Sequence, residues 1–208
     1  MMRARAVAVA SVALAMSLAL TGCLPFIPSP NPVPDTDQGN TVNATGFSTL
    51  TPEGIAEIKS SNTASFDLSD GQLTLEDVGL EPGTPPSDVV AESGKISLEI
   101  VGSGGTLTAE SDHLRFLAAD GENINPITYF LTTEDDDEFF AMIREGVERY
   151  GIDSTVAEEW ISSRAIDSDP ASDFALPLGT ALGFNVSYDL NYDPSTPVQV
   201  IIVQVYPL

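Results

Sequence analysis

Residues that could form a disulfide or a zinc site of cysteine and histidine are scarce in this chain, whose 208 residues include one cysteine and one histidine. A disulfide needs two cysteines, and structural zinc sites normally use three or four Cys or His ligands. The sequence also lacks the G-x-S-x-G, H-E-x-x-H and P-loop patterns. We therefore expect a fold that is stabilised by core packing, and we exclude the enzyme classes that those motifs define.

Positive charge is scarce as well. The chain has 8 Lys and Arg residues against 31 Asp and Glu residues, which gives a net charge of −23. A negative field of this size repels nucleic acid and anionic lipid headgroups, so we exclude both as partners. We interpret the acidic surface mainly as a source of solubility in an exported protein, with cation binding as the alternative.

Only one stretch of the sequence is long and apolar. Ala6–Leu20 is interrupted by Ser11 and Ser17 alone, and it follows the positive residues Arg3 and Arg5. A helix needs about 20 apolar residues to span a bilayer, so this run is too short to do so. Its length and its positive flank are instead typical of a secretory signal peptide.

The four residues that end this run carry the one family resemblance in the chain. Leu20-Thr21-Gly22-Cys23 resembles the lipobox of bacterial prolipoproteins. The resemblance implies that the signal peptide is removed before Cys23 and that Cys23 carries a diacylglycerol. Two acyl chains give stable anchoring, so we expect the protein on the outer face of the cell membrane, or on the outer membrane where the cell has one. The alternative is an ordinary secretory signal that ends near Gly22 and leaves Cys23 as a free thiol.

Composition then divides the chain into three segments. Residues 1–22 are predicted to be the cleaved signal peptide, 23–46 a linker that begins at the lipidated cysteine, and 47–208 a single globular domain. The linker holds five prolines between positions 25 and 34, followed by polar residues, a composition that favours an extended, disordered spacer. The remaining residues, about 160, are enough to bury a core without disulfides.

The globular domain is predicted to be mainly β, with an antiparallel sandwich or barrel-like architecture. Asp-Gly favours a two-residue turn, so Asp70-Gly71 predicts a hairpin. The last apolar segment has apolar residues on both faces, and we expect it to lie in the centre of a sheet, covered on both sides. The predicted strands are 63–69, 72–78, 95–101, 106–110, 114–117, 127–131, 184–192 and 198–206.

Two stretches have helical signals instead. Pro52 lies in the first turn of a predicted short helix, and residues 133–166 predict an inserted αα-hairpin because their apolar residues recur with a helical period. The predicted landmarks of the hairpin are a cap at Thr132 or Thr133, an ion pair of Glu145 with Arg149, a helix end at Gly151, and a capping box of Thr155 with Glu158.

Several residues are candidates for chemistry, each with a structural alternative. His113 would have to serve any Ser/His/Asp arrangement, but we expect a solvated histidine at a strand end. The acidic run Glu134–Glu138 favours a helix N-terminus, with cation binding as the alternative. Trp160, with Phe139 and Phe140, could line a ligand pocket, although aromatic residues at helical spacing more often form a core.

A weak calcium signal lies near the end of the helical region. Asp167, Asp169 and Asp173 place three carboxylates in one predicted loop, and calcium takes six to eight oxygen ligands from such loops. The EF-hand pattern requires Gly at its sixth position and Glu at its twelfth, where this sequence has Ser172 and Leu178. Calcium is therefore the only cofactor that we consider, and we expect none to be required.

These observations favour a non-catalytic binding or accessory module of the bacterial envelope, and they assign no catalytic residue. Its partners would be the membrane, through the lipid on Cys23, and an unknown envelope protein or small ligand. Two alternatives stay open. A hydrolase of envelope polymers could use a pair of carboxylates, but 31 acidic residues leave the pair unspecified. A calcium-dependent interaction module is the other.

Overall fold

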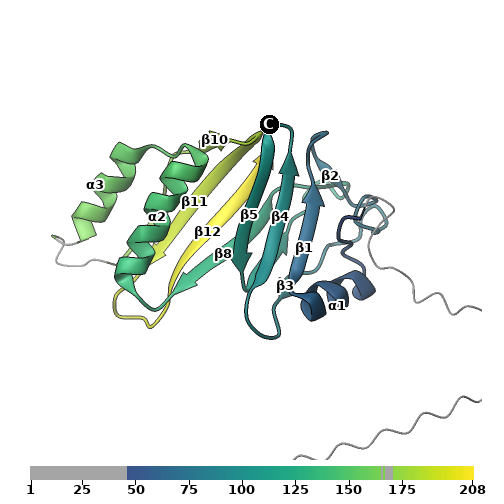
Figure 1. The fold of residues 1–208 in the computed structure, drawn as a ribbon, viewed down its shortest axis with the longest axis horizontal. Coiled ribbons are helices and arrows are strands. Elements are labelled where there is room, and N and C mark those ends of the chain that lie inside the picture. The colour runs from purple at the N-terminus through teal and green to yellow at the C-terminus, as the bar shows by residue number, and fades with distance from the viewer. Residues whose placement is uncertain (1–45, 165, 167–170) are drawn as a thin grey trace, which may run out of the picture. The chain divides into compact units, whose positions relative to one another are not determined.

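The structure, a computed structural model, describes residues 46–164, 166 and 171–208. Strand residues outnumber helical ones, which confirms the prediction of a mainly β domain (Figure 1). Within the described ranges, no helix is long and apolar enough to cross a bilayer. The predicted lipobox, Leu20 to Cys23, lies outside these ranges, as do Asp167 and Asp169.

The order of the elements confirms the predicted insertion of two helices between strands. The elements are α1 (Pro52–Ser61), β1 (Thr63–Asp67), β2 (Leu73–Thr74), β3 (Val89–Val90), β4 (Ile96–Gly102), β5 (Gly105–Ser111), β6 (His113–Phe116), β7 (Asn123–Ile124), β8 (Ile127–Thr133), α2 (Asp136–Tyr150), α3 (Ser154–Arg164), β9 (Ser172–Ala175), β10 (Gly179–Ala181), β11 (Phe184–Tyr192) and β12 (Gln199–Pro207).

The larger sheet has seven strands in the order β10-β11-β12-β8-β6-β3, and β9 also pairs with β11. All of these pairs are antiparallel. The sheet is open, since β3 ends it at one edge and β9 and β10 share the other. Strand registers align Tyr188 of β11, Val203 of β12, Tyr129 of β8 and Leu114 of β6 in one row, and all four are buried. One face of the larger sheet therefore forms the core.

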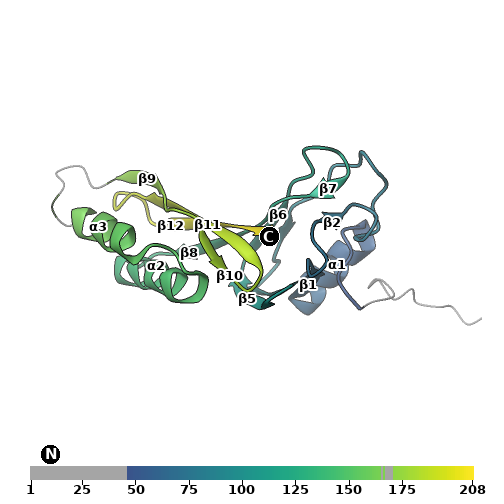
Figure 2. The same ribbon diagram turned by 90° about the horizontal axis from the view of Figure 1, so that it is seen from above.

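Two layers cover this core face side by side. The smaller sheet, β1-β4-β5, packs there through Phe66 of β1, whose ring meets Phe116 of β6 edge to face at a centroid distance of 5.2 Å. Helix α2 packs on the same face, where Gly146 lies against the ring of Tyr188. Figures 1 and 2 show the αα-hairpin and the smaller sheet on one side of the larger sheet.

Strand β12 lies in the centre of the larger sheet, as the sequence predicts, between β11 and β8. Its residues alternate between fully buried and half-buried. Ile201, Val203 and Val205 point into the core, whereas Val200 and Ile202 keep part of their surface exposed. The prediction that this strand is covered on both sides is therefore wrong for one face.

The predicted hairpin at Asp70-Gly71 is also wrong. Strand β1 pairs in parallel with β4, and β2 pairs with β7. The second half of the predicted hairpin is interrupted because the Asp77 carboxylate accepts hydrogen bonds from the N–H and the hydroxyl of Thr74 at 2.9 and 2.6 Å. This turn stops β2 after two residues, so the strand is too short to compete with β4 for the edge of β1.

The first helix of the αα-hairpin begins later than predicted. Its N-cap is Asp135, whose carboxylate accepts a hydrogen bond from the N–H of Glu138 at 2.8 Å. Thr133 instead donates its hydroxyl to the Glu138 carboxylate and accepts from the N–H of Asp135. A carboxylate at a helix N-terminus also gains from the helix dipole, which favours Asp135 over Thr132 or Thr133. The predicted end at Gly151, with φ of 66°, is confirmed.

The second helix has a different cap from the predicted capping box. The carboxylate of Asp153 accepts hydrogen bonds from the N–H groups of Thr155 and Val156, at 2.8 and 3.1 Å. Glu158 forms a two-pronged ion pair with Arg144 of α2, with N–O distances of 2.7 and 3.0 Å. This residue therefore joins the two helices instead of closing a capping box.

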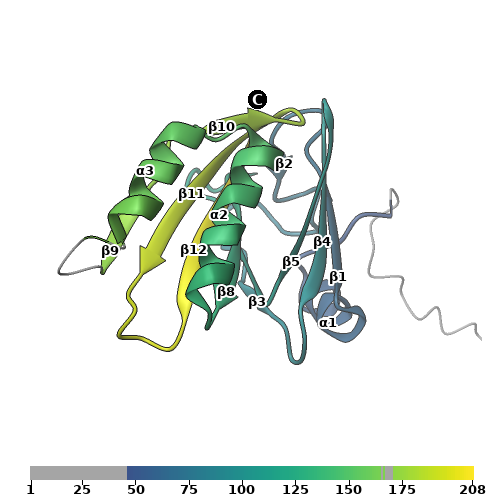
Figure 3. The ribbon, with the colours of Figure 1, turned by 60° about the vertical axis from the view of Figure 1, so that its left-hand side comes forward.

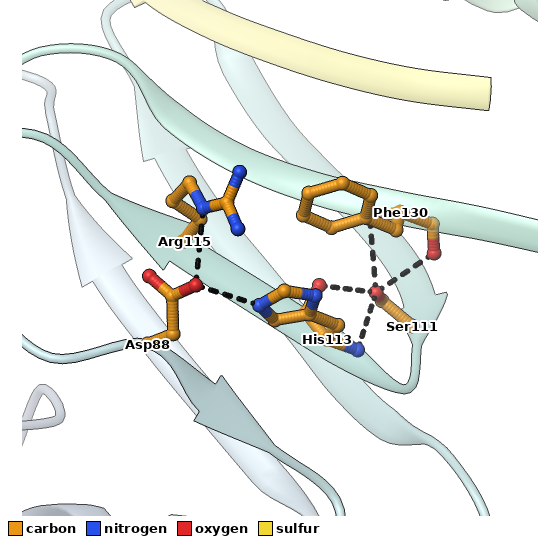
Figure 4. A network of polar contacts seen from close by, with 5 residues as sticks. All are labelled: Asp88, Ser111, His113, Arg115 and Phe130. Atoms are coloured by element: carbon orange, nitrogen blue, oxygen red, sulfur yellow. Dashed lines mark hydrogen bonds and ion pairs between the residues drawn. The ribbon is translucent and has the colours of Figure 1, made fainter. Parts of the chain in front are cut away.

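A buried hydroxyl joins the two sheets where β5 passes into β6 (Figure 4). Ser111 is 0% exposed, and its Oγ accepts hydrogen bonds from the N–H groups of His113 and Phe130 at 3.1 and 3.2 Å. It donates to the carbonyl of His113 at 2.7 Å or of Phe130 at 2.9 Å. The β6–β8 ladder ends at Leu114 and Tyr129, so this side chain replaces its next rung.

Removal of this hydroxyl is the first prediction. Ser111→Ala leaves two buried N–H groups without their acceptor, and each unsatisfied group costs about 1–3 kcal/mol. We expect the melting temperature to fall by roughly 2–4 °C for each kcal/mol lost. Ser97→Ala, at an exposed position of the smaller sheet, is the control and should melt like the wild type. Equal melting temperatures for the two variants would contradict the role of Ser111.

Candidate functional site

A cleft of about 370 Å³ lies between α2 and β5. This volume is near the lower end of the range for small-ligand sites. Figure 3 shows the two elements on the same side of the larger sheet, with β8 behind them. The cleft is lined by the helix, by β8 and β11, and by one end of the smaller sheet. At that end, Lys95 just before β4 and Ser97 within it contribute, and the second half of β5 contributes Thr108, Ala109 and Glu110.

Helix α2 contributes to the cleft through one stripe of its surface. The buried residues Phe139, Ile143, Gly146 and Tyr150 face the core. The adjacent stripe lines the cleft with Glu138, Met142, Glu145 and Arg149. These residues lie on one helix face because they are three or four positions apart in the sequence. One face of this helix is therefore buried in the core, and the cleft residues lie beside it.

The floor of the cleft contains three tyrosines, Tyr129, Tyr150 and Tyr188. All three are at most 2% exposed, and the hydroxyls of Tyr129 and Tyr150 lie 3.3 Å apart. Burial is the main cause that raises the pKa of each phenol above its ordinary value. These groups therefore stay protonated at neutral pH, where they can donate or accept hydrogen bonds but cannot act as bases.

The rim of the cleft carries charges of both signs. Glu145 and Arg149 form the predicted ion pair, 2.8 Å apart, with 58% and 37% of their side chains exposed. The second terminal nitrogen of Arg149, Nη2, donates to the carbonyl oxygen of Thr108, so this side chain crosses from the helix to β5. Glu110 and Glu138 are exposed as well. The cleft thus combines a neutral polar floor with a solvated, mainly acidic rim.

His113 belongs to a separate polar network at the start of β6 (Figure 4). Its Nε2 lies 2.9 Å from the Asp88 carboxylate, which also accepts a hydrogen bond from Arg115 at 3.0 Å. Burial raises the pKa of Asp88, but the hydrogen bonds and charges of His113 and Arg115 lower it by more. The His113 ring stacks on Phe130 with a centroid distance of 4.4 Å, so the expected solvated histidine is in fact half-buried.

This network does not form a Ser/His/Asp triad. The Ser111 oxygen is hydrogen-bonded to backbone groups of His113 and Phe130, and it is buried beneath the strand. A nucleophilic serine needs an exposed oxygen that is hydrogen-bonded to the histidine ring. The arrangement therefore stabilises the sheet junction.

The acidic candidates do not converge on a metal site in the described part of the chain. No group of three or more His, Cys, Asp or Glu residues is placed there to hold an ion. Within Glu134–Glu138, Asp135 caps the helix and Asp136 accepts a hydrogen bond from Tyr192 at 3.0 Å. Asp173 is exposed on β9. Calcium binding by the whole loop stays an untested prediction, because Asp167 and Asp169 lie outside the described residues.

The aromatic candidates form a packed cluster beneath the helices. Trp160 is 6% exposed, and its ring lies within 6.5 Å of the rings of Phe139, Phe140, Phe174 and Tyr192. The guanidinium of Arg164 lies 5.1 Å from the Trp160 ring. The interpretation of these aromatic residues as core is thereby supported, and they line no part of the cleft.

Sequence reasoning did not identify the cleft, because five separate elements, β4, β5, β8, α2 and β11, supply its residues. The tyrosines on the apolar faces of the elements are the one sequence feature that could have indicated it. A buried tyrosine usually needs a hydrogen-bond partner for its hydroxyl, and Tyr129, Tyr150 and Tyr188 each occupy a core-facing position on a different element. Three such tyrosines in one domain indicate a polar pocket inside the core.

Comparison of this chain with protein-family models, curated proteins and solved structures found no match. We therefore infer function from the geometry of the cleft.

The contact between Gly146 and Tyr188 gives a second prediction. A Cβ at position 146 would lie 2.6 Å from two ring carbons of Tyr188, and overpacking of this kind costs about 1–3 kcal/mol. Gly→Ala in an open helix position stabilises by about 0.5–1 kcal/mol instead. We expect Gly146→Ala to lower the melting temperature of the protein.

The matched control compares Gly with Ala at an exposed position of the same helix, where the methyl group has no close neighbour. Glu148 is exposed on the same helix, so Glu148→Ala should be more stable than Glu148→Gly. If Gly146→Ala also raised the melting temperature, the close packing of Tyr188 against the helix would be disproved.

Proposed function

We propose that this protein is a non-catalytic binding module of the bacterial envelope, and that its ligand binds in the cleft between α2 and β5. In this proposal the lipid on Cys23 holds the protein at the outer face of the membrane, and residues 23–46 are the spacer. The polar floor and charged rim of the cleft support the binding role. The lipobox resemblance at Leu20-Thr21-Gly22-Cys23 supports the anchor.

The observation that carries the binding role is the burial of neutral phenols beneath an open cleft. Hydroxyls of this kind fix the orientation of a bound polar group. The three phenols carry three protons, since each phenol has a single donor. The hydrogen bonds of Tyr129 with Tyr150 and with Tyr188 use two of them. The third proton can be donated to an acceptor in the cleft, which all three residues line.

The same geometry favours binding over carboxylate-dependent hydrolysis. A glycosidase needs one carboxyl group that stays protonated, which burial usually achieves, beside a second carboxylate. The carboxylates of the cleft, Glu110, Glu138 and Glu145, lie on exposed residues at its rim. The buried ionisable groups of the cleft are phenols, and the pKa of each is raised further by burial.

Photo-crosslinking in the native cells tests the binding role. Met142 lines the cleft and is half-buried, so a benzophenone amino acid at this position should form an adduct with whatever occupies the cleft. Adding Ser97→Trp, which places a large ring on the cleft wall, should reduce the adduct by roughly tenfold or more, as expected when a bulky group excludes a ligand from its site.

Glu99→Trp is the matched control, because Glu99 is exposed on the same strand and the same face but does not line the cleft. The adduct should form in this variant as in the parent. No adduct from Met142, or an adduct that both tryptophan variants leave unchanged, would refute the cleft as the binding site.

The anchor has its own test. Cys23→Ser removes the sulfur that would carry the diacylglycerol, and a protein without both acyl chains loses stable membrane attachment. We expect the variant to leave the membrane fraction and to appear in the soluble extracellular or periplasmic fraction, whereas Ser17→Ala, inside the signal peptide, should stay membrane-bound. Retention of the Cys23→Ser variant in the membrane would disprove lipid anchoring at this residue.

A further inference from the structure

Strand β5 is the edge of the smaller sheet, and its free edge faces the cleft. It pairs with β4 on one side and with no other strand of the described chain on the other. Edge strands present a row of N–H and C=O groups that can pair with another extended chain, so proteins usually shield them. Here the shield is helix α2, whose Arg149 donates to the carbonyl of Thr108.

The register of the hairpin identifies the groups on this edge. Gly102 pairs with Gly105 across a two-residue turn, and in an antiparallel pair hydrogen-bonded residues alternate with residues that point away. Thr106, Thr108 and Glu110 therefore direct their backbone groups away from β4. The bond from Arg149 to the Thr108 carbonyl agrees with this assignment. Within the described chain, the N–H groups of these three residues have no backbone partner.

The edge is held rigidly at both ends. At one end, the Ser111 hydroxyl ties β5 to the backbone of Phe130 in β8. At the other end, the N–H of Gly104 donates to the carbonyl of Leu182 at 3.2 Å, which ties the hairpin to the turn between β10 and β11. The intervening residues 106–110 form a preformed strand edge, and a preformed site reduces the ordering cost of binding.

We propose that the ligand of the cleft is an extended peptide segment of another protein, which adds a strand to the free edge of β5 beneath α2. This inference rests on the proposed binding function and names the class of its ligand. Strand addition uses main-chain hydrogen bonds for affinity and alternate side chains for specificity. One set of peptide side chains would contact Tyr129, Leu131 and Met142 on the inner surface of the cleft.

The charges of the cleft favour a peptide that carries basic residues. Glu110, Glu138 and Glu145 outnumber Lys95 and Arg149 at the rim, and the chain as a whole carries a net charge of −23. An incoming peptide N–H takes the Thr108 carbonyl from Arg149, and a basic peptide side chain replaces its positive charge beside Glu145. A field of this sign also speeds the arrival of cationic ligands.

The test uses the full chain and a display library of random peptides of about eight residues, enough to span the edge. Selected peptides are synthesised and their dissociation constants are measured. N-methylation of the peptide backbone should weaken binding by about fivefold at every second position and by less than about twofold at the positions between, since one net hydrogen bond is worth about 1 kcal/mol. Exchange of the peptide's basic residues for Glu should also weaken binding.

A pair of substitutions at one edge residue provides the matched protein control. Thr108→Pro removes the edge N–H, at a position where an edge strand tolerates proline, and should weaken binding by about fivefold. Thr108→Val changes the side chain but keeps the N–H, and should bind within about twofold of the wild type. Melting temperatures near that of the wild type establish that both variants fold.

The outcomes separate this inference from the proposed function. Strand addition would be overturned by peptides that lose binding to Ser97→Trp but bind Thr108→Pro normally and are weakened equally by N-methylation at successive positions. The cleft would then still be a binding site. A library that yields no peptide sensitive to Ser97→Trp would overturn the peptide ligand, and the Met142 adduct would then report on the cleft independently. Loss of both the peptides and the adduct would refute the site itself.

Discussion

The hydrogen bonds of the Ser111 hydroxyl are the constraint on which the arrangement of the two sheets depends. The chain leaves the smaller sheet at this residue and enters the larger one two residues later, at His113. A strand that simply continued would fuse the sheets into one. The hydroxyl instead occupies the place of a ladder rung on β8. Strand β5 is therefore tied to the larger sheet at Ser111 and, through Gly104, at the turn between β10 and β11, and within the described residues its free edge is unpaired between these points. This unpaired edge forms one wall of the cleft.

The other wall follows from how the core face of the larger sheet is shared. This sheet presents more apolar surface than the smaller sheet covers, and α2 buries the remainder through Phe139, Ile143 and Tyr150. Two rigid layers on one twisted sheet meet only where side chains happen to fill the gap between them. Arg149 bridges that gap at one point. Elsewhere it stays open above Tyr129 and Tyr188, which explains why polar groups occur in an otherwise apolar core.

Local patterns predicted the elements well, but not their partners. Alternation along 184–192 identified β11 and its buried face because both depend only on neighbouring residues. The partner of β1 was missed because Asp70-Gly71 is a strong local turn signal, whereas pairing with β4 joins residues more than thirty positions apart. The cap of α2 was misplaced because Thr132, Thr133 and Asp135 all have side chains that can cap. The choice among them depends on Glu138, whose carboxylate engages Thr133.

The cleft was beyond sequence reasoning for a related reason. Each of its residues has an ordinary explanation in its own element: Tyr150 completes a helix face, Tyr188 alternates along a strand, and Arg149 pairs with Glu145. They become a site only when Ser111 and Gly104 fix the position of β5 against α2. Hydrocarbon side chains would fill the same core positions without needing hydrogen-bond partners, and a buried hydroxyl without a partner costs stability. Tyr129 meets this requirement through its hydrogen bonds with Tyr150 and Tyr188, so the three phenols stabilise one another and keep the floor of the cleft polar.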